Sequence, residues 1–291
     1  MFASPLIQNN AFLRKSAICL MQVPRSIRRL VANPSAYLQH PPVLCNSFPK
    51  SGTHLLVQIL EALPGVQQLG TFLASIPSRP FRQRPNAVML RKLQRLIPGE
   101  LAAAHLYYKL PYVEALRRLH VVHYFIYRDL RDVAISEAHY LAKMNRWHQL
   151  HRYYNNMSTD ADRIAWAITG ESDPLFPFEY PDIGRRFASY RGWLDSDEVC
   201  AVRFEDLIGK EREHQIRRIV AYYLKCSKVT ANIDTVVASA IRRISPLRSR
   251  TFREGKQGGW KQVFGEKHRS LMKQTAGSVL VDLGYEQNEH W

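Results

Sequence analysis

The pattern of apolar and polar positions predicts a strand, a loop and a helix around residue 50. The run Pro42–Asn46 is short and apolar and ends in a turn residue, which predicts a buried strand. One face of a helix is then formed by apolar residues at helical spacing, namely Leu55, Leu56, Ile59, Leu60 and Leu63. Pro64 and Gly65 end this pattern. Residues 47–54 are therefore predicted to be a loop that leads into a helix N-terminus.

The sequence of this loop, Ser-Phe-Pro-Lys-Ser-Gly-Thr-His, suits the binding of an anion. The first turn of a helix carries unpaired backbone N–H groups and a partial positive charge, so it can hold a phosphate. Gly52 lets the backbone close around oxygen atoms, and Ser51 and Thr53 add hydroxyl donors. Lys50 adds a mobile positive charge. The same residues also fit an ordinary capped helix, so the anion site is a hypothesis here.

Two further runs predict the rest of a parallel sheet. Val121–Tyr127 is a continuous run of β-formers, as expected for a strand covered on both faces, and Val199–Phe204 is a third strand candidate. Helices are expected over 130–141 and 205–224 because apolar or charged residues recur there at helical spacing. Strands that alternate with helices favour a single α/β domain with a central parallel sheet flanked by helices. Ligands of such sheets bind beyond the carboxyl ends of the strands.

The remaining segments are less regular. Residues 1–41 are interpreted as a basic N-terminal arm because no acidic residue precedes Glu61, a bias that transit peptides share. Residues 66–100 contain four prolines that prevent a long helix, together with six basic residues between 79 and 95. Residues 145–195 are rich in aromatics and turn formers, and helices are expected near 182–194 and 233–244.

Composition fits one domain and an anionic ligand. The 291 residues with 46% hydrophobic content can bury a full core. Lysine and arginine number 41 against 25 acidic residues, a formal charge of +16. This charge favours anionic partners without choosing among nucleotide, nucleic acid and lipid.

Disulfides, metals and membrane spans are not expected. The four cysteines are far apart without a CxxC pair, which indicates buried thiols in a reducing, cytoplasmic compartment: Cys19, Cys45, Cys200 and Cys226. His148 and His151 are three positions apart, but no third ligand has a matching spacing. No apolar run approaches the roughly 18 residues of a membrane span, so the chain is interpreted as soluble.

The loop differs from the nucleotide phosphate loop GxxxxGK[ST], because Lys50 precedes Gly52 and no glycine stands upstream. Phe-Pro-Lys-Ser-Gly-Thr instead resembles the 5′-phosphosulfate loop of sulfotransferases that use 3′-phosphoadenylyl sulfate (PAPS). The segment Tyr127–Ser136 resembles the 3′-phosphate motif of this family. The resemblance implies that Arg128 at the strand end and Ser136, eight positions later, both contact that phosphate. From the residues alone, Arg128 also fits an ion pair with Asp132 on a helix face.

A third motif, Phe252–Lys261, resembles the C-terminal RKGxxGDWK loop of the family, which closes over the 3′-phosphate. Arg253 and Gly255 match it, whereas Glu254 stands where a lysine is usual and Gly259 where an aspartate is usual. The segment 204–207 resembles the family's YEDL sequence, with phenylalanine in place of tyrosine. The resemblance therefore implies these nucleotide contacts: Lys50, Ser51, Gly52, Thr53, His54, Arg128, Ser136, Phe204, Arg253, Glu254 and Gly255.

Sulfuryl transfer needs a base near the attacking atom, and His105 is the candidate. It precedes Arg128 by 23 residues, which is similar to the separation in cytosolic sulfotransferases. A lone histidine is more often structural, so this role depends on the ordered set of motifs. Ala103 stands where a lysine is frequent in the family, and Leu55 where a tryptophan often stacks on the adenine.

The resulting hypothesis is a PAPS-dependent sulfotransferase with a fold like that of P-loop nucleotide kinases. Residues 42–291 form its domain. It transfers a sulfuryl group to a hydroxyl or amine of a small molecule, with His105 as base and Lys50 stabilising the departing 3′-phosphoadenosine 5′-phosphate (PAP). No metal, nucleic acid or membrane span is expected, and a homodimer is one option. A nucleotide-dependent kinase and a non-catalytic nucleic-acid binder remain as alternatives.

Overall fold

The computed structural model describes residues 16, 25–30, 32–245, 257–288 and 290–291. These residues contain a five-stranded sheet in the order β2-β3-β1-β4-β5, and every neighbouring pair is parallel. In chain order the strands are β1 (Val43–Ser47), β2 (Gln67–Ala74), β3 (Glu100–His105), β4 (Val122–Tyr127) and β5 (Val199–Arg203). β1 is the central strand, so the loop that follows it leaves the middle of the sheet.

Helices connect the strands and extend the fold beyond them. Those before residue 145 are α3 (Pro34–Gln39), α4 (Thr53–Leu60), α5 (Asn86–Leu93), α6 (Leu110–Arg118), α7 (Leu130–His139) and the π-helix η1 (Tyr140–Met144). Those after it are α8 (His151–Asn156), α9 (Asp160–Thr169), α10 (Ile183–Arg191), α11 (Phe204–Ile208), α12 (Arg212–Cys226), α13 (Ile233–Arg243), α14 (Trp260–Val263) and α15 (Glu266–Asp282).

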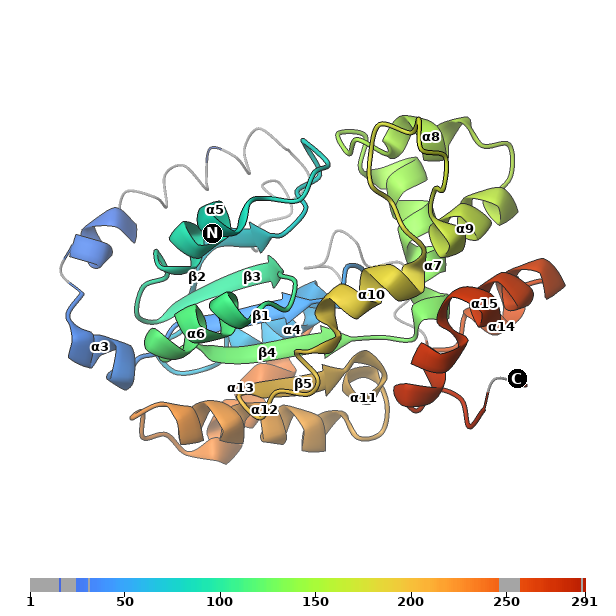
Figure 1. Ribbon diagram of the computed structural model, residues 1–291. Coiled ribbons are helices and arrows are strands. Elements are labelled where there is room, and N and C mark those ends of the chain that lie inside the picture. The colour runs from blue at the N-terminus through green and yellow to red at the C-terminus, as the bar shows by residue number, and fades with distance from the viewer. Residues whose placement is uncertain (1–15, 17–24, 31, 246–256, 289) are drawn as a thin grey trace.

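The sheet is buried on both faces because successive strand residues point to opposite sides. In β1, Val43 and Cys45 belong to a core cluster with α4, α12 and α13, whereas Leu44 belongs to a cluster with α5, α6 and α10. Figure 1 shows α12 and α13 along one side of the sheet, and α7, α8, α9 and α15 gathered beyond the carboxyl ends of the strands. The last group forms a helical wall opposite the strand ends.

The predicted fold class is confirmed. The single α/β domain with its central parallel sheet is present, and the three predicted strands correspond to β1, β4 and β5. The helices predicted over 182–194 and 233–244 correspond to α10 and α13. The helix predicted over 130–141 ends two residues early as α7, and η1 continues it with wider turns.

The sequence prediction missed β2 and β3, and it also missed the helices α5, α6, α8, α9, α14 and α15. β3 has the sequence Glu-Leu-Ala-Ala-Ala-His, and alanine has low strand propensity, so only its neighbours in the sheet decide its conformation. β2 contains Gly70 at a φ of 82° and a register shift between Gln68 and Phe72, which interrupts the alternating pattern. The helix predicted over 205–224 is wrong as one element, because α11 ends before Gly209 and α12 begins at Arg212.

The N-terminal arm reaches the sheet domain at Arg25, in the helical segment 25–30. The guanidinium of Arg25 lies 2.7 Å from the buried carboxylate of Glu100, at the start of β3. The same guanidinium donates to the carbonyl oxygen of Arg95. Most of residues 1–24 lie outside the described residues. Where it is described, the arm therefore contacts the domain through an ion pair with a buried partner.

Among the described cysteines, Cys45 and Cys200 are buried free thiols, as predicted. The prediction that Cys226 is buried is wrong, because it ends α12 and is exposed. Within the part of the chain that the structure describes, no helix has the length and apolar character needed to cross a membrane.

Candidate active site

The loop between β1 and α4 takes a tight turn at the carboxyl edge of the sheet. Lys50 and Gly52 both have a positive φ, 68° and 101°. The carbonyl oxygen of Gly52 accepts the first hydrogen bonds of α4, from the N–H groups of Leu55 and Leu56. A side chain at position 52 would clash, since a Cβ atom there would lie 2.4 Å from Cδ2 of Phe204. Glycine is required here by both its φ and the close approach of Phe204.

The hydroxyl groups of Ser51 and Thr53 differ in their partners within the described part of the chain: that of Thr53 is hydrogen-bonded and that of Ser51 is not. Ser51 is completely buried, and among the described residues its Oγ has no hydrogen-bond partner. A buried hydroxyl without a partner is costly, so this atom fits an anion that the loop would surround. Thr53 Oγ1 lies 2.7 Å from Ser47 Oγ, which fixes the Thr53 side chain at the first turn of α4. Loop and helix start together form a cradle suited to a phosphate or sulfate group.

Lys50 points from this loop into the site. Its ammonium lies 3.8 Å from the ring centroid of Tyr140, the first residue of η1. Burial lowers the pKa of Lys50 to about 8, with Glu137 opposing and Arg128 adding to the change. Lys50 is therefore a cation whose charge is easily lost above neutral pH.

His105 is the last residue of β3, next to β1, and the two strand ends share hydrogen bonds. Its Nδ1 lies 3.1 Å from the carbonyl oxygen of Ser47 and 3.0 Å from Ser47 Oγ. A carbonyl can only accept, so we assign the proton to Nδ1, which leaves the Nε2 lone pair free to act as a base. Burial lowers the pKa of His105 to about 4. The imidazole is therefore neutral at pH 7, the form that a general base requires.

Arg128 follows β4 directly and lies beside the loop of β1. Its Nη2 is 3.4 Å from Oδ2 of Asp132, one helical turn later, and its guanidinium carbon lies 4.5 Å from the ring centroid of Phe204. The ion pair with Asp132 that the sequence offered as an alternative is thus present. It does not remove Arg128 from the site, because Arg128, Asp132 and Ser136 all line the same cavity as Lys50.

One cavity of about 650 Å³ brings these residues together. Its wall contains the following predicted site residues: Lys50, Gly52, Thr53, His54, His105, Arg128, Ser136 and Phe204. Ser51 belongs to the same loop but is completely buried and is not among the residues that line the cavity. Arg253, Glu254 and Gly255 lie outside the described residues. The residues on either side of that segment, Ser245 and Gly259, both line the cavity.

Described residues on both sides of segment 246–256 are held at the cavity wall. Gln58, which is buried in α4, accepts a hydrogen bond from the N–H of Ser245 at 2.8 Å and donates to its carbonyl oxygen at 3.2 Å. Asp132 accepts from the N–H groups of Gly258 and Trp260, both at 3.0 Å. Burial raises the pKa of Asp132, an effect that Arg128 and these two N–H groups oppose. Gly259, in the described part of the third motif, thus lines the same cavity as residues of the first two motifs.

Much of the remaining wall of the cavity is formed by apolar and aromatic side chains: Phe72, Ile76, Phe81, Ile135, Leu141, Met144, Tyr180 and Tyr190. Phe72 packs edge-on against His105 with ring centroids 5.1 Å apart, so part of this apolar wall lies beside the imidazole. Glu137 and Arg186 also line the cavity, and Nη1 of Arg186 donates to both carboxylate oxygens of Glu137, at 2.7 and 2.6 Å.

Sequence reasoning missed Gln58, Glu137, Tyr140 and Arg186. Glu137 and Tyr140 lie in the helix predicted after the 3′-phosphate motif, close to Ser136. This position could have indicated that both residues are near the site. Arg186 lies 49 positions from its partner Glu137, and no spacing connects them. His148 and His151 are engaged separately: His148 Nδ1 accepts from the N–H of Leu150, and His151 Nδ1 is 2.7 Å from the carbonyl oxygen of Leu141. No group of three metal-binding side chains occurs among the described residues.

The sheet order, the anion cradle after the central strand and the arginine after its neighbour define a P-loop-like α/β protein. Within this class the chain belongs to the sulfotransferase domain family, because the family model described as "Sulfotransferase domain" matches residues 40–284. Among curated protein sequences, none matches this chain significantly.

Solved structures with the same fold include two that are described with PAP. Mouse sulfotransferase SULT7A1 complexed with PAP is 18% identical, with a TM-score of 0.59 over 84% of this chain and 86% of that chain. Retinol dehydratase in complex with androsterone and the inactive cofactor PAP is 13% identical, with a TM-score of 0.51 over 85% of this chain and 83% of that chain. At these identities the similarity concerns the fold.

Proposed function

We propose that this protein is a PAPS-dependent sulfotransferase that acts on a hydroxyl or amine of a small molecule. The observation that carries the proposal is that one cavity joins the anion cradle, the strand-end arginine and a neutral histidine with a free Nε2. These three features come from β1, β4 and β3, which are adjacent in the sheet. The family membership and the PAP named with both structural relatives support the same assignment.

The residues present fit a nucleotide with an anionic group at each end. The backbone of residues 51–53 and the unpaired Ser51 hydroxyl would hold the 5′-phosphosulfate. Arg128 and Ser136 would hold the 3′-phosphate, because a guanidinium offers two parallel donors to phosphate oxygens. Arg253 and Gly255 remain proposed contacts, supported by the positions of Ser245 and Gly259 at the cavity.

The proposed adenine-binding part of the site lacks the stacking tryptophan that is frequent in the family, because Leu55 stands at that position. The cavity wall near the cradle instead offers aliphatic side chains at Leu55, Leu207, Ile208 and Ile244. Phe204, which replaces the family's tyrosine, packs between Gly52 and Arg128 and so supports both anion-binding elements. We infer that the adenine ring is held by apolar contact with these residues.

Two side chains have chemical roles in the proposed reaction: His105 accepts the proton of the acceptor, and Lys50 stabilises the negative charge of the leaving group. When bound, PAPS supplies the sulfuryl group and leaves as PAP. His105 Nε2 takes the proton of the acceptor hydroxyl or amine, while its Nδ1–H stays bonded to the Ser47 carbonyl. Lys50 offers its positive charge where negative charge develops on the leaving group, in a cavity that weakens solvent screening. No step requires a metal ion.

The acceptor end of the cavity favours a largely apolar molecule. The charges of Glu137 and Arg186 compensate each other there, and both side chains are mostly buried, with 12% and 13% exposed. The surrounding wall is aromatic and aliphatic, so a neutral acceptor would bury apolar surface without leaving a charge unpaired.

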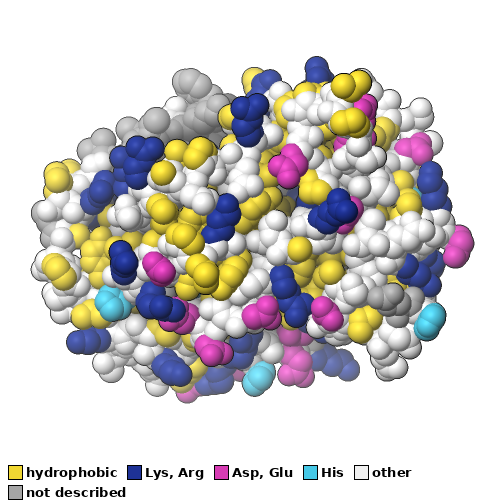
Figure 2. Space-filling view, in the orientation of Figure 1, with side chains coloured by type: hydrophobic (Ala, Val, Ile, Leu, Met, Phe, Trp, Pro, Cys, Tyr) yellow, Lys and Arg dark blue, Asp and Glu magenta, His cyan; other side chains and the backbone are white. Residues whose placement is uncertain are grey.

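Figure 2 shows lysine and arginine spread among acidic side chains over the lower part of one face, unlike the basic stripe of a nucleic-acid binder.

The proposal also covers domain organisation and location. Residues 42–291 would form the catalytic domain and residues 1–41 a basic arm that contacts it through Arg25 and Glu100. The free thiols of Cys45, Cys200 and Cys226 support a reducing compartment such as the cytoplasm.

The test is a nucleotide-binding comparison followed by an acceptor screen. PAP is expected to raise the melting temperature more than AMP does, because only PAP carries the 3′-phosphate. Sulfur-labelled PAPS is then offered with panels of phenols, alcohols and amines, with and without EDTA. Label transfer that persists in EDTA supports the proposal. Equal stabilisation by PAP and AMP, or ATP-dependent phosphoryl transfer that EDTA abolishes, would refute it.

A further inference from the structure

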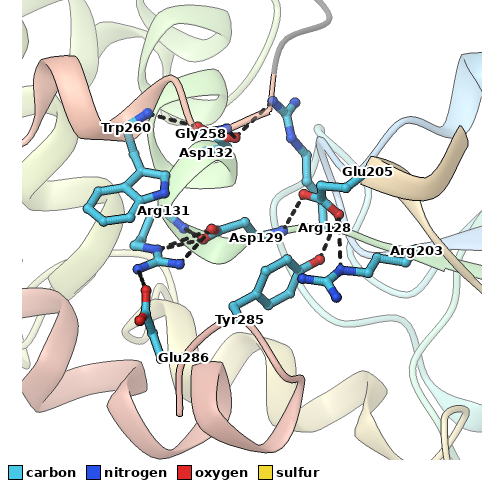
Figure 3. Close-up of polar contacts among 10 residues, drawn as sticks. All are labelled: Arg128, Asp129, Arg131, Asp132, Arg203, Glu205, Gly258, Trp260, Tyr285 and Glu286. Atoms are coloured by element: carbon cyan, nitrogen blue, oxygen red, sulfur yellow. Dashed lines mark hydrogen bonds and ion pairs between the residues drawn. The ribbon is translucent and has the colours of Figure 1, made fainter. Parts of the chain in front are cut away.

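The turn that carries Arg128 is held from behind by the C-terminal end of the chain. The turn spans Arg128–Asp132, between β4 and α7, and Figure 3 shows Tyr285 and Glu286 pointing toward it. The residues that make this contact do not line the cavity, except for Arg128 and Asp132 themselves. Any effect of the C-terminal residues on the nucleotide would therefore act through the position of the turn.

The first contact runs through Arg131, whose side chain is only 2% exposed. Its guanidinium binds both oxygens of Asp129, and the Asp129 carboxylate also accepts from the N–H of Arg131 at 2.9 Å. Nη1 of Arg131 donates to the carboxylate of Glu286. The guanidinium carbon also lies 3.8 Å from the ring centroid of Trp260 and 4.6 Å from that of Trp291. A buried arginine is thus shared between the turn and the C-terminal end.

The second contact runs through Glu205, a buried residue of α11. One carboxylate oxygen accepts from the N–H of Asp129 at 3.1 Å, and the other accepts from the hydroxyl of Tyr285 at 2.8 Å. The guanidinium of Arg203 pairs with the same carboxylate at 3.6 Å and lies 3.9 Å from the ring centroid of Tyr285. Tyr285 therefore fixes the carboxylate that holds the peptide immediately after Arg128.

The two contacts converge on Asp129, the residue that caps α7. Its backbone N–H is held by Glu205 and its side chain by Arg131, so Tyr285 and Glu286 restrain the same peptide from two sides. Because Arg128 precedes that peptide, a displacement of the cap moves the start of the arginine side chain. A shift of well under 1 Å is enough to weaken a bidentate phosphate contact.

We propose that Tyr285 and Glu286 are positioning residues for the 3′-phosphate end of the nucleotide site. The inference rests on the proposed function and adds to it that the affinity for the 3′-phosphate is set partly by residues outside the cavity. The affinity for a nucleotide without that phosphate should not depend on them, because the 5′ cradle is built from β1 and α4.

The experiment measures the dissociation constants of PAP and AMP by calorimetry for the full-length protein and its Tyr285→Phe and Glu286→Gln variants. Each variant keeps the size of the side chain and removes one hydroxyl or one charge. We expect PAP to bind about three- to tenfold more weakly, the effect of one lost hydrogen bond in a charged network. AMP binding is expected to change less than about twofold, and KM for PAPS should rise while kcat is kept.

Matched controls are available elsewhere in the chain. Glu198→Gln removes a carboxylate that pairs with Arg117 at 2.7 Å. Tyr223→Phe removes a hydroxyl that donates to the carbonyl oxygen of Pro64 at 2.9 Å. Neither residue lines the cavity. Both controls are expected to retain the wild-type ratio of PAP to AMP affinity.

The possible results separate the two proposals. If the wild-type protein does not prefer PAP to AMP, the proposed function fails before any variant is compared. If the wild type prefers PAP and the variants keep that preference, or lose affinity for both nucleotides equally, the positioning role is wrong while the function stands. Should Tyr285→Phe fail to fold, the Glu286→Gln ratio decides, because the Glu286 side chain is 21% exposed and tolerates the change more easily.

Discussion

The ammonium of Lys50 lies 3.8 Å from the centre of the Tyr140 ring, so the proposed leaving-group cation rests on an aromatic face. Tyr140 reaches this position from the first residue of a π-helix, and its hydroxyl is held by the side-chain amide of Asn145 at 3.0 Å. An aromatic face stabilises a cation in a desolvated site. Tyr140 therefore opposes the burial that lowers the pKa of Lys50.

Replacing Tyr140 with leucine is expected to move the alkaline limb of the pH profile of kcat/KM. Lys50 acts as a cation, so activity should fall as pH rises through its pKa of about 8. Without the ring the charged form is less stable, and the limb should shift to lower pH by roughly half to one unit. Tyr140→Phe keeps the aromatic face and should keep the limb. Identical profiles for the leucine and phenylalanine variants would show that the ring does not tune Lys50.

The acid limb of the same profile is expected near the low pKa of His105. The base is active when neutral, so activity should be lost only as pH falls through about 4. Between this limb and that of Lys50, the profile should be broad and flat. An acid limb near 6.5, the ordinary value for histidine, would mean that a different group is the base.

His105→Ala should lower kcat about 10²- to 10⁴-fold, the usual contribution of a general base. PAP binding should be kept, because the proposed nucleotide contacts come from other strands. His214→Ala is the matched control, since His214 is on the exposed surface of α12. Turnover by His105→Ala within a few-fold of wild type, with the fold intact, would contradict the assignment.

Arg128→Lys tests the geometry of the phosphate contact as distinct from its charge. Lysine keeps one positive charge but cannot offer two parallel donors, so PAP should bind about 10- to 100-fold more weakly. AMP should bind as in the wild type because it has no 3′-phosphate. The comparison is made by calorimetry at one salt concentration. An unchanged ratio of PAP to AMP affinity would place the 3′-phosphate elsewhere.

Gly52→Ala is expected to destabilise the protein and to abolish PAP binding. Alanine would adopt a φ of 101° unfavourably, and its Cβ would lie 2.4 Å from the Phe204 ring. The free energy of unfolding should fall by roughly 1–3 kcal/mol, measured by urea denaturation. Gly265→Ala is the control, because a Cβ at that position has no atom within 4 Å. A loss as small as that of the control would show that the cradle can relax.

Much of the fold follows from local pattern. The continuous apolar run of β4 and the strand, loop and helix around Gly52 were predicted at nearly their observed bounds, since burial on both faces demands such runs. β3 was missed because its alanines carry no strong preference, although the proposed base His105 ends this strand. The order of motifs along the chain indicated His105, but its neighbours did not.

The sequence by itself determined which side chains are available for the proposed anion binding and proton transfer: Lys50, Ser51, Gly52, His105 and Arg128 occur in this order along the chain. Only the tertiary structure decided the tautomer of His105, the aromatic support of Lys50 and the link from Glu286 to the turn of Arg128. The physical reason is that side-chain chemistry and local periodicity are encoded within a few residues. Burial and partner contacts, in contrast, join positions as far apart as 131 and 286, where no spacing rule applies.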